Sequence, residues 1–312
     1  MSRPLVSVVV PAYNVGTAFL RDAISSALGQ TYGNLEVIVV NDASTDNTME
    51  CVGEFADPRL RVIDLPENRG LSGARNAGTE AASGSWVTFL DADDRMMPEM
   101  TERLLDMADT TGADIACCGF MRTRPRAILP ESSGVRPVLT VSPEAAIADA
   151  LYQTGSLNNS ACGKLYRREL CLRQQWIEGW FEDLRTFYRI FLLAGRIAWT
   201  AEPLYAYTVN PASYMQRFTP GRAVVLDVTE EMVGYMEAHC PELVAAASDR
   251  ALSAAFNILK LMRANDVKNP EVAARCKSII RRYRCRSLFN RRVRAKNKLA
   301  ILASYLGGLH LL

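Results

Sequence analysis

Apolar residues in the first hundred positions are grouped in short continuous runs. Many members are β-branched, and the runs occupy residues 6–10, 37–40, 60–65 and 85–90. Helical stretches with one apolar face separate them, the first of which ends near Leu28. Strands that are apolar on both faces are typical of a parallel sheet covered by helices. The pattern therefore predicts an α/β fold with a Rossmann-like, mainly parallel sheet flanked by helices.

Polar side chains come directly after the predicted strands. Asn14 follows the first strand, Asp42 the second, and Asp91 and Asp93 the fourth. Ligands of open α/β sheets bind at the carboxyl ends of the strands, so we expect these loops to face one crevice. In the loop after the second strand, we expect Ser44 or Thr45 to cap the next helix.

The loop after the fourth strand, Asp91-Ala92-Asp93-Asp94, carries three carboxylates in four residues. Carboxylates this close repel one another, and hard oxygen ligands suit Mg²⁺ or Mn²⁺. Such ions are usually held by one or two carboxylates together with substrate phosphates, which points to a nucleotide diphosphate as the ligand. The alternative is an acidic turn that caps the helix starting near Pro98.

Further motifs follow in a fixed order. The chain carries Val6–Asn14, the Asn41–Asp46 turn, Asn68–Gly78 and Phe89–Asp94, with an acidic element downstream at Phe181–Phe187. Together these segments resemble the family 2 glycosyltransferases, which have the nucleotide-sugar-binding GT-A fold, over roughly residues 5–215. Two positions depart from the family pattern. Ala43 stands where Gly is usual, and Cys162-Gly163 stands where relatives often carry an aromatic residue and Asn. The second departure bears on the acceptor.

The resemblance implies metal-dependent sugar transfer with inversion at the anomeric carbon. Asp93 is then the expected protein ligand of Mn²⁺ or Mg²⁺, with Asp91 as a second ligand or a partner of the ribose. Asp183 is the expected general base, with Glu182 beside it at the start of a predicted helix. The alternative is that these two acids only complement the helix dipole.

The residues that we expect to bind the nucleotide sugar are Pro11, Ala12, Tyr13, Asn14, Asp42, Arg75, Asp91 and Ala92. Asp42 would accept the imide N–H of uracil or guanine, or else stabilise a turn. Arg75 would contact the nucleotide or pair with an Asp. A UDP-sugar is the favoured donor. Lys164, Arg167 and Arg168 are expected on a solvated basic face.

Composition narrows the class. The 312 residues include eight scattered cysteines without paired Cys-x-x-Cys motifs, which indicates reduced thiols in the cytoplasm. Only two histidines are present, which disfavours a His-based triad or metal centre. No signal peptide is evident, because the first apolar run is short and interrupted by Pro11. A nicotinamide dehydrogenase is disfavoured because no dinucleotide fingerprint follows the first strand.

The C-terminal end differs in charge from the rest. Eleven Lys or Arg lie between Arg275 and Lys298, and no acidic residue follows Glu271. The apolar run Leu299–Leu312 comes next and is too short to span a bilayer. This combination indicates an interfacial anchor on an anionic membrane surface. The alternative is a helix that packs on the catalytic domain. Nucleic acid is disfavoured as a partner.

We therefore expect a GT-A catalytic domain over residues 1–218 and a helical region over 219–312. The catalytic domain divides into a nucleotide-sugar-binding half, 1–115, and an acceptor-binding half, 116–218. The predicted activity is that of an inverting, hexosyltransferase-like enzyme that extends a glycan or lipid-linked glycan in surface polysaccharide biosynthesis. Its predicted location is the cytoplasmic face of the membrane. The alternative is a catalytically silent nucleotide-sugar-binding partner or regulator of another transferase.

Overall fold

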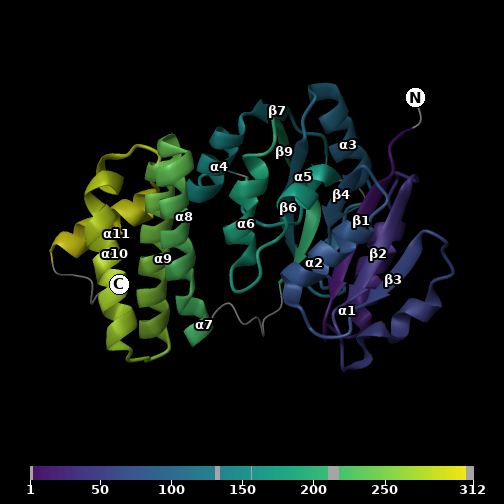
Figure 1. Cartoon of the computed structure of the whole chain (residues 1–312), viewed down its shortest axis with the longest axis horizontal. Helices are drawn as coiled ribbons and strands as arrows, with labels where there is room; N and C mark the ends of the chain where they lie inside the picture. Colours follow the sequence, from purple (N-terminus) through teal and green to yellow (C-terminus); the bar gives the residue numbers. More distant parts are fainter. Residues whose placement is uncertain (1–2, 131–133, 156, 210–217, 307–312) are drawn as a thin grey trace. The chain divides into compact units, whose positions relative to one another are not determined.

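The structure, a computed structural model, describes residues 3–130, 134–155, 157–209 and 218–306 (Figure 1). The chain divides into two compact units. The first comprises Met1–Ala146 and Asn159–Pro211, and the second comprises Ile147–Asn158 and Ala212–Leu312. The domain boundary expected at residue 218 stays a prediction, and residues 210–217 beside it lie outside the described part.

The four strands predicted at the start of the chain are present in the first unit. They pair in the order β3-β2-β1-β4, and every pair among them is parallel. The side chains of β1 are buried along its whole length, as expected for a strand covered on both faces. Their bounds are Val6–Ala12 for β1, Leu35–Asn41 for β2, Leu60–Asp64 for β3 and Trp86–Phe89 for β4.

The rest of the sheet is mixed. It continues from β4 in the order β8-β6-β9-β5, and β7 pairs with β9. In the described part of the chain, β6 and β9 form the only parallel pair beyond β4, whereas β8, β5 and β7 pair antiparallel with their neighbours. These strands are β5 (Arg95–Met96), β6 (Ile115–Thr123), β7 (Val138–Val141), β8 (Lys164–Arg167) and β9 (Ile197–Thr208). The predicted α/β class and the flanking helices are confirmed.

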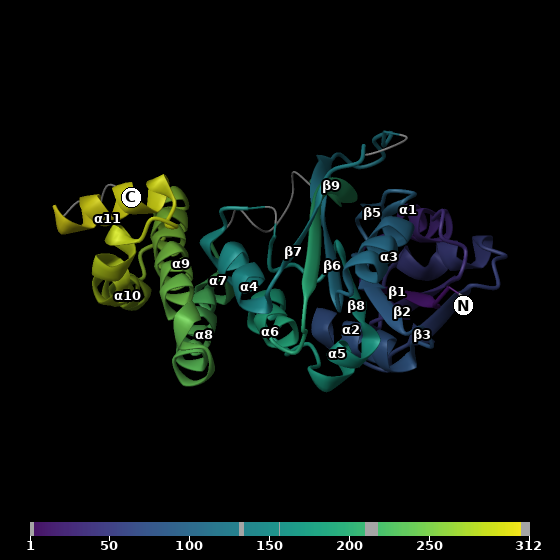
Figure 2. The same ribbon diagram turned by 90° about the horizontal axis from the view of Figure 1, so that it is seen from above.

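Helices cover both faces of this sheet, with α1 and α3 on one side and α2 and α5 on the other (Figure 2). A Cβ on Gly78 of α2 would lie 2.3 Å from Val9 Cγ1, so the missing side chain lets α2 pack directly on the sheet. The helices are α1 (Thr17–Leu28), η1 (Asn47–Glu54), α2 (Gly70–Ala81), α3 (Met100–Thr111), α4 (Pro143–Tyr152), α5 (Arg168–Arg173) and α6 (Glu182–Phe191).

The expected cap in the loop after β2 was wrong. Neither Ser44 nor Thr45 caps the next helix, which is the 3₁₀ helix η1. The Asp46 carboxylate accepts the hydrogen bond from the backbone N–H of Thr48. The loop turns at Ala43, whose φ of 58° is in the left-handed region, and η1 begins only at Asn47.

The second unit is helical. Arg275 of α10 pairs with Asp227 and Glu230 of α8, at 2.6 and 2.8 Å. No helix in the described residues is long and apolar enough to cross a membrane. The helices are α7 (Pro220–Ala223), α8 (Val225–His239), η3 (Pro241–Leu243), α9 (Val244–Ala264), α10 (Pro270–Phe289) and α11 (Ala295–Tyr305).

Candidate active site

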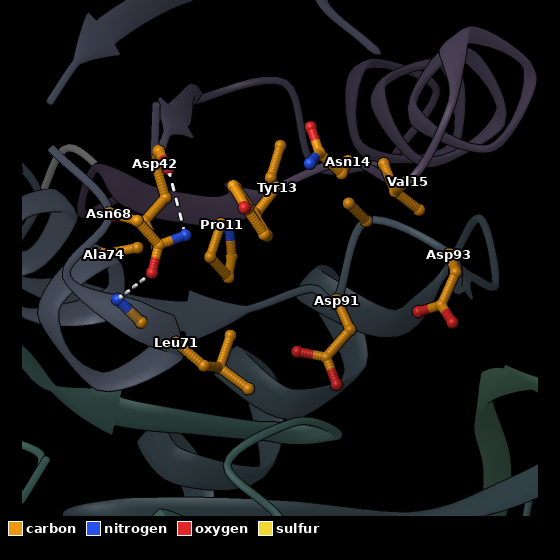
Figure 3. A pocket seen from close by; sticks show the side chains of 13 residues that line it. Pro11, Tyr13, Asn14, Val15, Asp42, Asn68, Leu71, Ala74, Asp91 and Asp93 are labelled. Carbon is orange, nitrogen blue, oxygen red and sulfur yellow. Dashed lines mark hydrogen bonds between the residues drawn. The ribbon is translucent and has the colours of Figure 1, made fainter. Parts of the chain in front are cut away.

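A pocket of about 400 Å³ lies at the carboxyl ends of β1, β2 and β4. Four segments of the chain surround it, which confirms that the predicted loops face one crevice. Figure 3 shows the Asp91 and Asp93 side chains projecting from one loop, with Asp42 on the other side of Pro11 and Tyr13. The pocket is lined by Pro11, Ala12, Tyr13, Asn14, Val15, Asp42, Asn68, Gly70, Leu71, Ala74, Asp91, Ala92 and Asp93.

The far wall of the pocket is held by side chains from the first two loops. Asn14 has a φ of 46°, and its amide oxygen accepts the backbone N–H of Thr45 at 2.8 Å. Asp42 is buried, and its carboxylate accepts the backbone N–H of Arg69 at 2.7 Å. Tyr13, by contrast, is 50% exposed. Asn14 and Asp42 therefore fix the loops, while Tyr13 offers an open aromatic surface.

The acidic loop separates its three carboxylates into different environments. Asp94 is buried, accepts the backbone N–H of Thr208 at 2.7 Å and accepts the Tyr205 hydroxyl at 2.8 Å. Burial, and then the charge of Asp91, raise the pKa of Asp94 to about 8. Asp94 therefore ties the loop to β9.

Asp91 and Asp93 remain available to the pocket. Desolvation by the surrounding protein, and then the charge of Asp91, raise the pKa of Asp93, although the Asp93 side chain is exposed at the pocket mouth. The alternative role, a cap on α3, is not what these acids do. The residue that caps α3 is Glu99, and it makes no side-chain capping hydrogen bond.

Arg75 lies in α2, fully buried and absent from the pocket lining. Its guanidinium donates to Asp183 at 2.6 Å and to Asp91 at 3.1 Å, and it lies 3.5 Å from Glu182. The ring of Trp176 stacks against it, with the guanidinium carbon 5.2 Å from the ring centroid. Of the two expected roles of Arg75, the structure shows the pairing with Asp. One buried arginine thus connects the acidic loop at the pocket with the pair of acids in α6.

Glu182 and Asp183 occupy the first turn of α6, which confirms their predicted place at a helix N-terminus. Phe181, immediately before them, has a φ of 60°, in a region that is unfavourable for an aromatic residue. Both carboxylates are partly exposed, 20% for Glu182 and 22% for Asp183. The helix dipole favours negative charge at this position. The dipole is not the only influence, because the hydrogen bond from Arg75 also holds Asp183 in one orientation.

Three carboxylates share the single charge of Arg75, so the cluster retains excess negative charge. Desolvation and then the neighbouring Asp183 raise the pKa of Glu182 to about 7. Burial also raises the pKa of Asp183, and the charges of Arg75 and Lys164 oppose this rise. A group whose pKa lies near neutrality beside an ionised partner is typical of acid–base sites.

The expected solvated basic face at Lys164 was wrong. Lys164 is 1% exposed in β8, and its ammonium donates to the backbone oxygen of Ser160 at 2.6 Å. Desolvation lowers the pKa of Lys164, and Asp183 is among the groups whose charge opposes this. Lys164 is therefore a second buried cation in the electrostatic environment of the acids. The residues around Lys164 in the sequence did not indicate that its side chain is buried.

The fit of a divalent cation depends on Asp91 and Asp93. No group of three His, Cys, Asp or Glu side chains that could hold a metal ion occurs among the described residues. Two carboxylates at the mouth of a pocket nevertheless suit a hard cation, which usually takes its other ligands from substrate phosphates and water. The raised pKa of Asp93 beside Asp91 indicates negative charge that a cation would relieve. The residues present therefore fit Mg²⁺ or Mn²⁺.

Two partners of the site had no signal in the sequence. Tyr205 accepts the backbone N–H of Asp91 through its hydroxyl at 3.2 Å and donates to Asp94, and Trp176 covers Arg75. The residues next to them in the sequence do not mark either aromatic residue as part of a site. Their roles depend on chain segments that are distant in sequence.

Comparison with known proteins decides the family. The model of the family described as "Glycosyl transferase family 2" matches residues 7–172, more than half of the chain. This chain belongs to that family. The predicted resemblance is therefore confirmed, and the matched residues include the pocket loops, Arg75 and Lys164.

Relatives of this family 2 chain cover different parts of it. The uncharacterized glycosyltransferase EpsJ of Bacillus subtilis is 36% identical over 67% of this chain and 62% of its own length. The succinoglycan biosynthesis protein ExoO of Rhizobium meliloti is 48% identical over 36% of this chain and 32% of its own length. The chain thus spans less than two thirds of both relatives.

A solved structure extends the likeness in fold to almost the whole chain. Residues 1–349 of Staphylococcus aureus TarS, in complex with UDP-GlcNAc, match with a TM-score of 0.68. The match covers 98% of this chain and 88% of the TarS chain at 18% sequence identity. The likeness confirms the predicted GT-A fold with its C-terminal helices.

Proposed function

We propose that this protein is an inverting glycosyltransferase that moves one sugar, of the hexose type, from a nucleotide diphosphate to a hydroxyl of a glycan or lipid-linked glycan. The observation that carries the proposal is the position of Arg75. It bonds to Asp91 at the edge of the pocket and to Asp183 at the start of α6. A carboxylate able to act as a base therefore lies beside a cavity suited to a nucleotide sugar.

The donor would lie with its base and ribose against Pro11, Ala12 and Tyr13. The half-exposed Tyr13 ring offers a stacking surface, and the Asp42 carboxylate offers an acceptor for the imide N–H of uracil. The TarS structure with UDP-GlcNAc supports a UDP-sugar as the favoured donor. Asn14 and Ala92 also line the pocket. Arg75, which is buried, would act on the donor through Asp91.

In the reaction, an oxygen of the acceptor hydroxyl attacks the anomeric carbon from the face opposite the nucleotide. The bond between the anomeric carbon and the diphosphate oxygen breaks, and its electron pair leaves with the diphosphate. The proton of the hydroxyl passes to the Asp183 carboxylate. A single displacement of this kind inverts the configuration at the anomeric carbon.

Asp183 must be both ionised and oriented to take that proton. Arg75 orients it through the 2.6 Å hydrogen bond, and the charges of Arg75 and Lys164 favour its ionised form. Glu182, whose pKa is about 7, can hold a proton beside it. We therefore assign the base to Asp183, a supporting role to Glu182, a positioning role to Arg75 and an electrostatic role to Lys164.

Asp93 and Asp91 would hold Mn²⁺ or Mg²⁺. When bound, the cation supplies positive charge next to the leaving diphosphate. Asp94 and Tyr205 keep the loop that carries both ligands in place.

The cellular role that we propose is surface polysaccharide assembly on the cytoplasmic face of a membrane. The family relative ExoO, which is named for succinoglycan biosynthesis, supports the pathway class. All eight cysteines are free thiols, seven of them buried, as expected for a reducing compartment.

The proposal is tested by incubating the purified chain with Mn²⁺ and a panel of nucleotide sugars, with and without glycan acceptors. The readout is released nucleoside diphosphate. We expect release with at least one donor and loss of that release in Asp183→Asn. A chain that binds a donor by calorimetry but releases no diphosphate under any condition would instead be a nucleotide-sugar-binding partner of another transferase.

A further inference from the structure

Helix α11 in the second unit buries mainly polar side chains and exposes leucines, the reverse of an ordinary surface helix. Its buried side chains are Asn297, Ile301 and Ser304, so two of the three are polar. On the opposite side, Leu299 is 67% exposed and Leu302 is 48% exposed. Leu306, at the end of the helix, is 87% exposed and continues the same line at helical spacing. A helix that only packs on its own unit would place the leucines inside.

Several contacts fix this orientation of α11. The Asn297 amide donates to Ser253 at 2.6 Å and lies 3.3 Å from the carboxylate of Asp249, both in α9. From α10, the guanidinium of Arg284 donates to the Ser304 backbone oxygen at 3.0 Å and stacks 3.9 Å from the Tyr305 ring centroid. The polar stripe is therefore matched to polar partners, and the outward leucines follow from it.

The exposed apolar side chains are concentrated at this end of the unit. In the part of the second unit that the structure describes, every large apolar residue that is exposed lies between Phe289 and Leu306. Phe289, which ends α10, is 80% exposed, but it lines a groove between α8 and α10 whose lining includes none of the α11 leucines. We call the set of Leu299, Leu302 and Leu306 the apolar edge. Exposed leucines that share one line of a helix form a contiguous apolar row, which is typical of an interaction site.

Positive charge surrounds the apolar edge. Arg291 and Arg292, between α10 and α11, are exposed, as is Lys296 in the first turn of α11. At 100° per residue, Lys296 and Lys298 fall on the two sides of the Leu299–Leu302 line. The charge of Arg294 lowers the pKa of Lys296, which shows that the positive charges repel one another here. The sequence has no acidic residue after Glu271 to balance them.

We propose that the apolar edge inserts into the headgroup region of an anionic lipid bilayer, with the flanking arginines and lysines on lipid phosphates. A narrow row of leucines between cations suits a lipid interface, which a single helix face can enter. A stable protein interface needs a larger area, of the order of 1,000 Å². A second copy of the chain is disfavoured because a symmetric contact would bring like charges together. The inference rests on the proposed function only for its membrane location.

The test uses the full chain and sedimentation with phosphatidylcholine vesicles, with or without phosphatidylglycerol. The variant Leu299→Ser/Leu302→Ser should bind phosphatidylglycerol vesicles at least about tenfold more weakly, because two apolar side chains no longer leave water. The matched control is Ile128→Ser/Leu139→Ser, two exposed apolar residues of the first unit, at 98% and 51% exposure. The control should bind as the unchanged protein does.

A second pair isolates the charge. Arg291→Gln/Lys296→Gln should weaken binding about tenfold to thirtyfold at low salt, and the difference should shrink as salt rises. The control, Arg124→Gln/Lys268→Gln, removes two exposed cations elsewhere. Truncation is a poorer test, because α10 buries Cys276, Ile279, Ile280 and Tyr283 in the unit.

Three results would overturn the inference. The first is no binding of the unchanged protein to phosphatidylglycerol vesicles, and the second is equal binding by Leu299→Ser/Leu302→Ser. The third is a lipid-free dimer, seen by light scattering, that the leucine variant converts to monomer, which would assign the apolar edge to a second copy. Asp183→Asn should bind vesicles normally, so failure of the catalytic proposal and failure of this one are separable.

Residues 307–312 of the predicted anchor lie outside the described part of the chain.

Discussion

Two of the buried polar clusters in the described part of the chain, one from each unit, differ in their charge balance. In the first unit, Arg75 serves three carboxylates, and two of these, Glu182 and Asp183, keep about a fifth of their surface exposed. In the second unit, Asp249 is fully buried and is bonded by the neutral amide of Asn297, and the charges of Arg294 and Arg250 act on it as well. The first cluster borders a pocket, whereas Asp249 lies between helices.

The difference separates chemistry from packing. In a partly exposed cluster with excess negative charge, the pKa of a carboxyl group is raised toward neutrality. Such a group can gain and lose a proton near neutral pH, which acid–base catalysis requires. A single buried carboxylate with hydrogen-bonding neighbours fixes how two helices meet. Both clusters raise the pKa of an acid, to about 7 for Glu182 and about 6 for Asp249, so a shifted pKa alone does not identify a catalytic residue.

The most direct test of this difference is to neutralise one acid from each cluster. Asp183→Asn should lower turnover about 10²- to 10⁴-fold, because the amide keeps the shape but cannot take the acceptor proton. Donor affinity should stay nearly unchanged. Asp249→Asn is the matched control and should leave turnover intact. Transfer rates at saturating substrates and donor calorimetry decide the matter, and a fully active Asp183→Asn would place the base elsewhere.

Asp93 tests whether the outer part of the first cluster holds a cation. Asp93→Ala should weaken Mn²⁺-dependent donor binding at least about a hundredfold, since even supporting groups around a metal cost tenfold to a hundredfold. Donor titrations by calorimetry with Mn²⁺ and with EDTA measure this. Unchanged affinity with Mn²⁺ would exclude Asp93 as a ligand.

Asp249 should affect the free energy of unfolding rather than the rate of transfer. Its pKa is raised by burial to about 6 from 3.8, so the folded state binds this proton more tightly than the unfolded chain does. The stabilisation that comes from this proton is therefore fully present below about pH 4 and is lost as pH rises through about 6. The free energy of unfolding should fall by up to about 3 kcal/mol over this range. The difference in unfolding free energy between the unchanged protein and Asp249→Asn, from urea titrations across this range, gives the slope. A difference that does not vary with pH would contradict the assignment.

The smallest expected effect concerns the partner of the base. Removing the charge of Glu182 stabilises the ionised form of Asp183, because like charges raise each other's pKa. In Glu182→Gln, the acidic limb of the kcat–pH profile should therefore move to lower pH, with at most about a tenfold fall in maximal rate. Lys164→Met removes an opposing charge and should move the limb to higher pH. Shifts in the same direction would show that these residues do not act on the base through charge. If Glu182→Gln is inactive and Asp183→Asn is not, the two roles are exchanged.

The sequence specified the strands of the first ninety residues closely. The apolar runs gave the four parallel strands within a few residues, because strands buried on both faces tolerate only apolar side chains. The acids of the 91–94 loop follow the end of a strand, as the sequence predicted. The same patterns placed Glu182 and Asp183 at a helix start.

Tertiary structure decided which of these residues meet and how they are charged. Arg75, Asp91 and Asp183 are far apart in the chain, and only the packing of α2 and α6 around the end of β4 brings them within hydrogen-bonding distance. The burial of Lys164 likewise depends on its neighbours, because a lysine carries no local mark of the dielectric around it. Local patterns record which face of an element avoids water. The pairing of charges depends on long-range contacts, which no local pattern encodes.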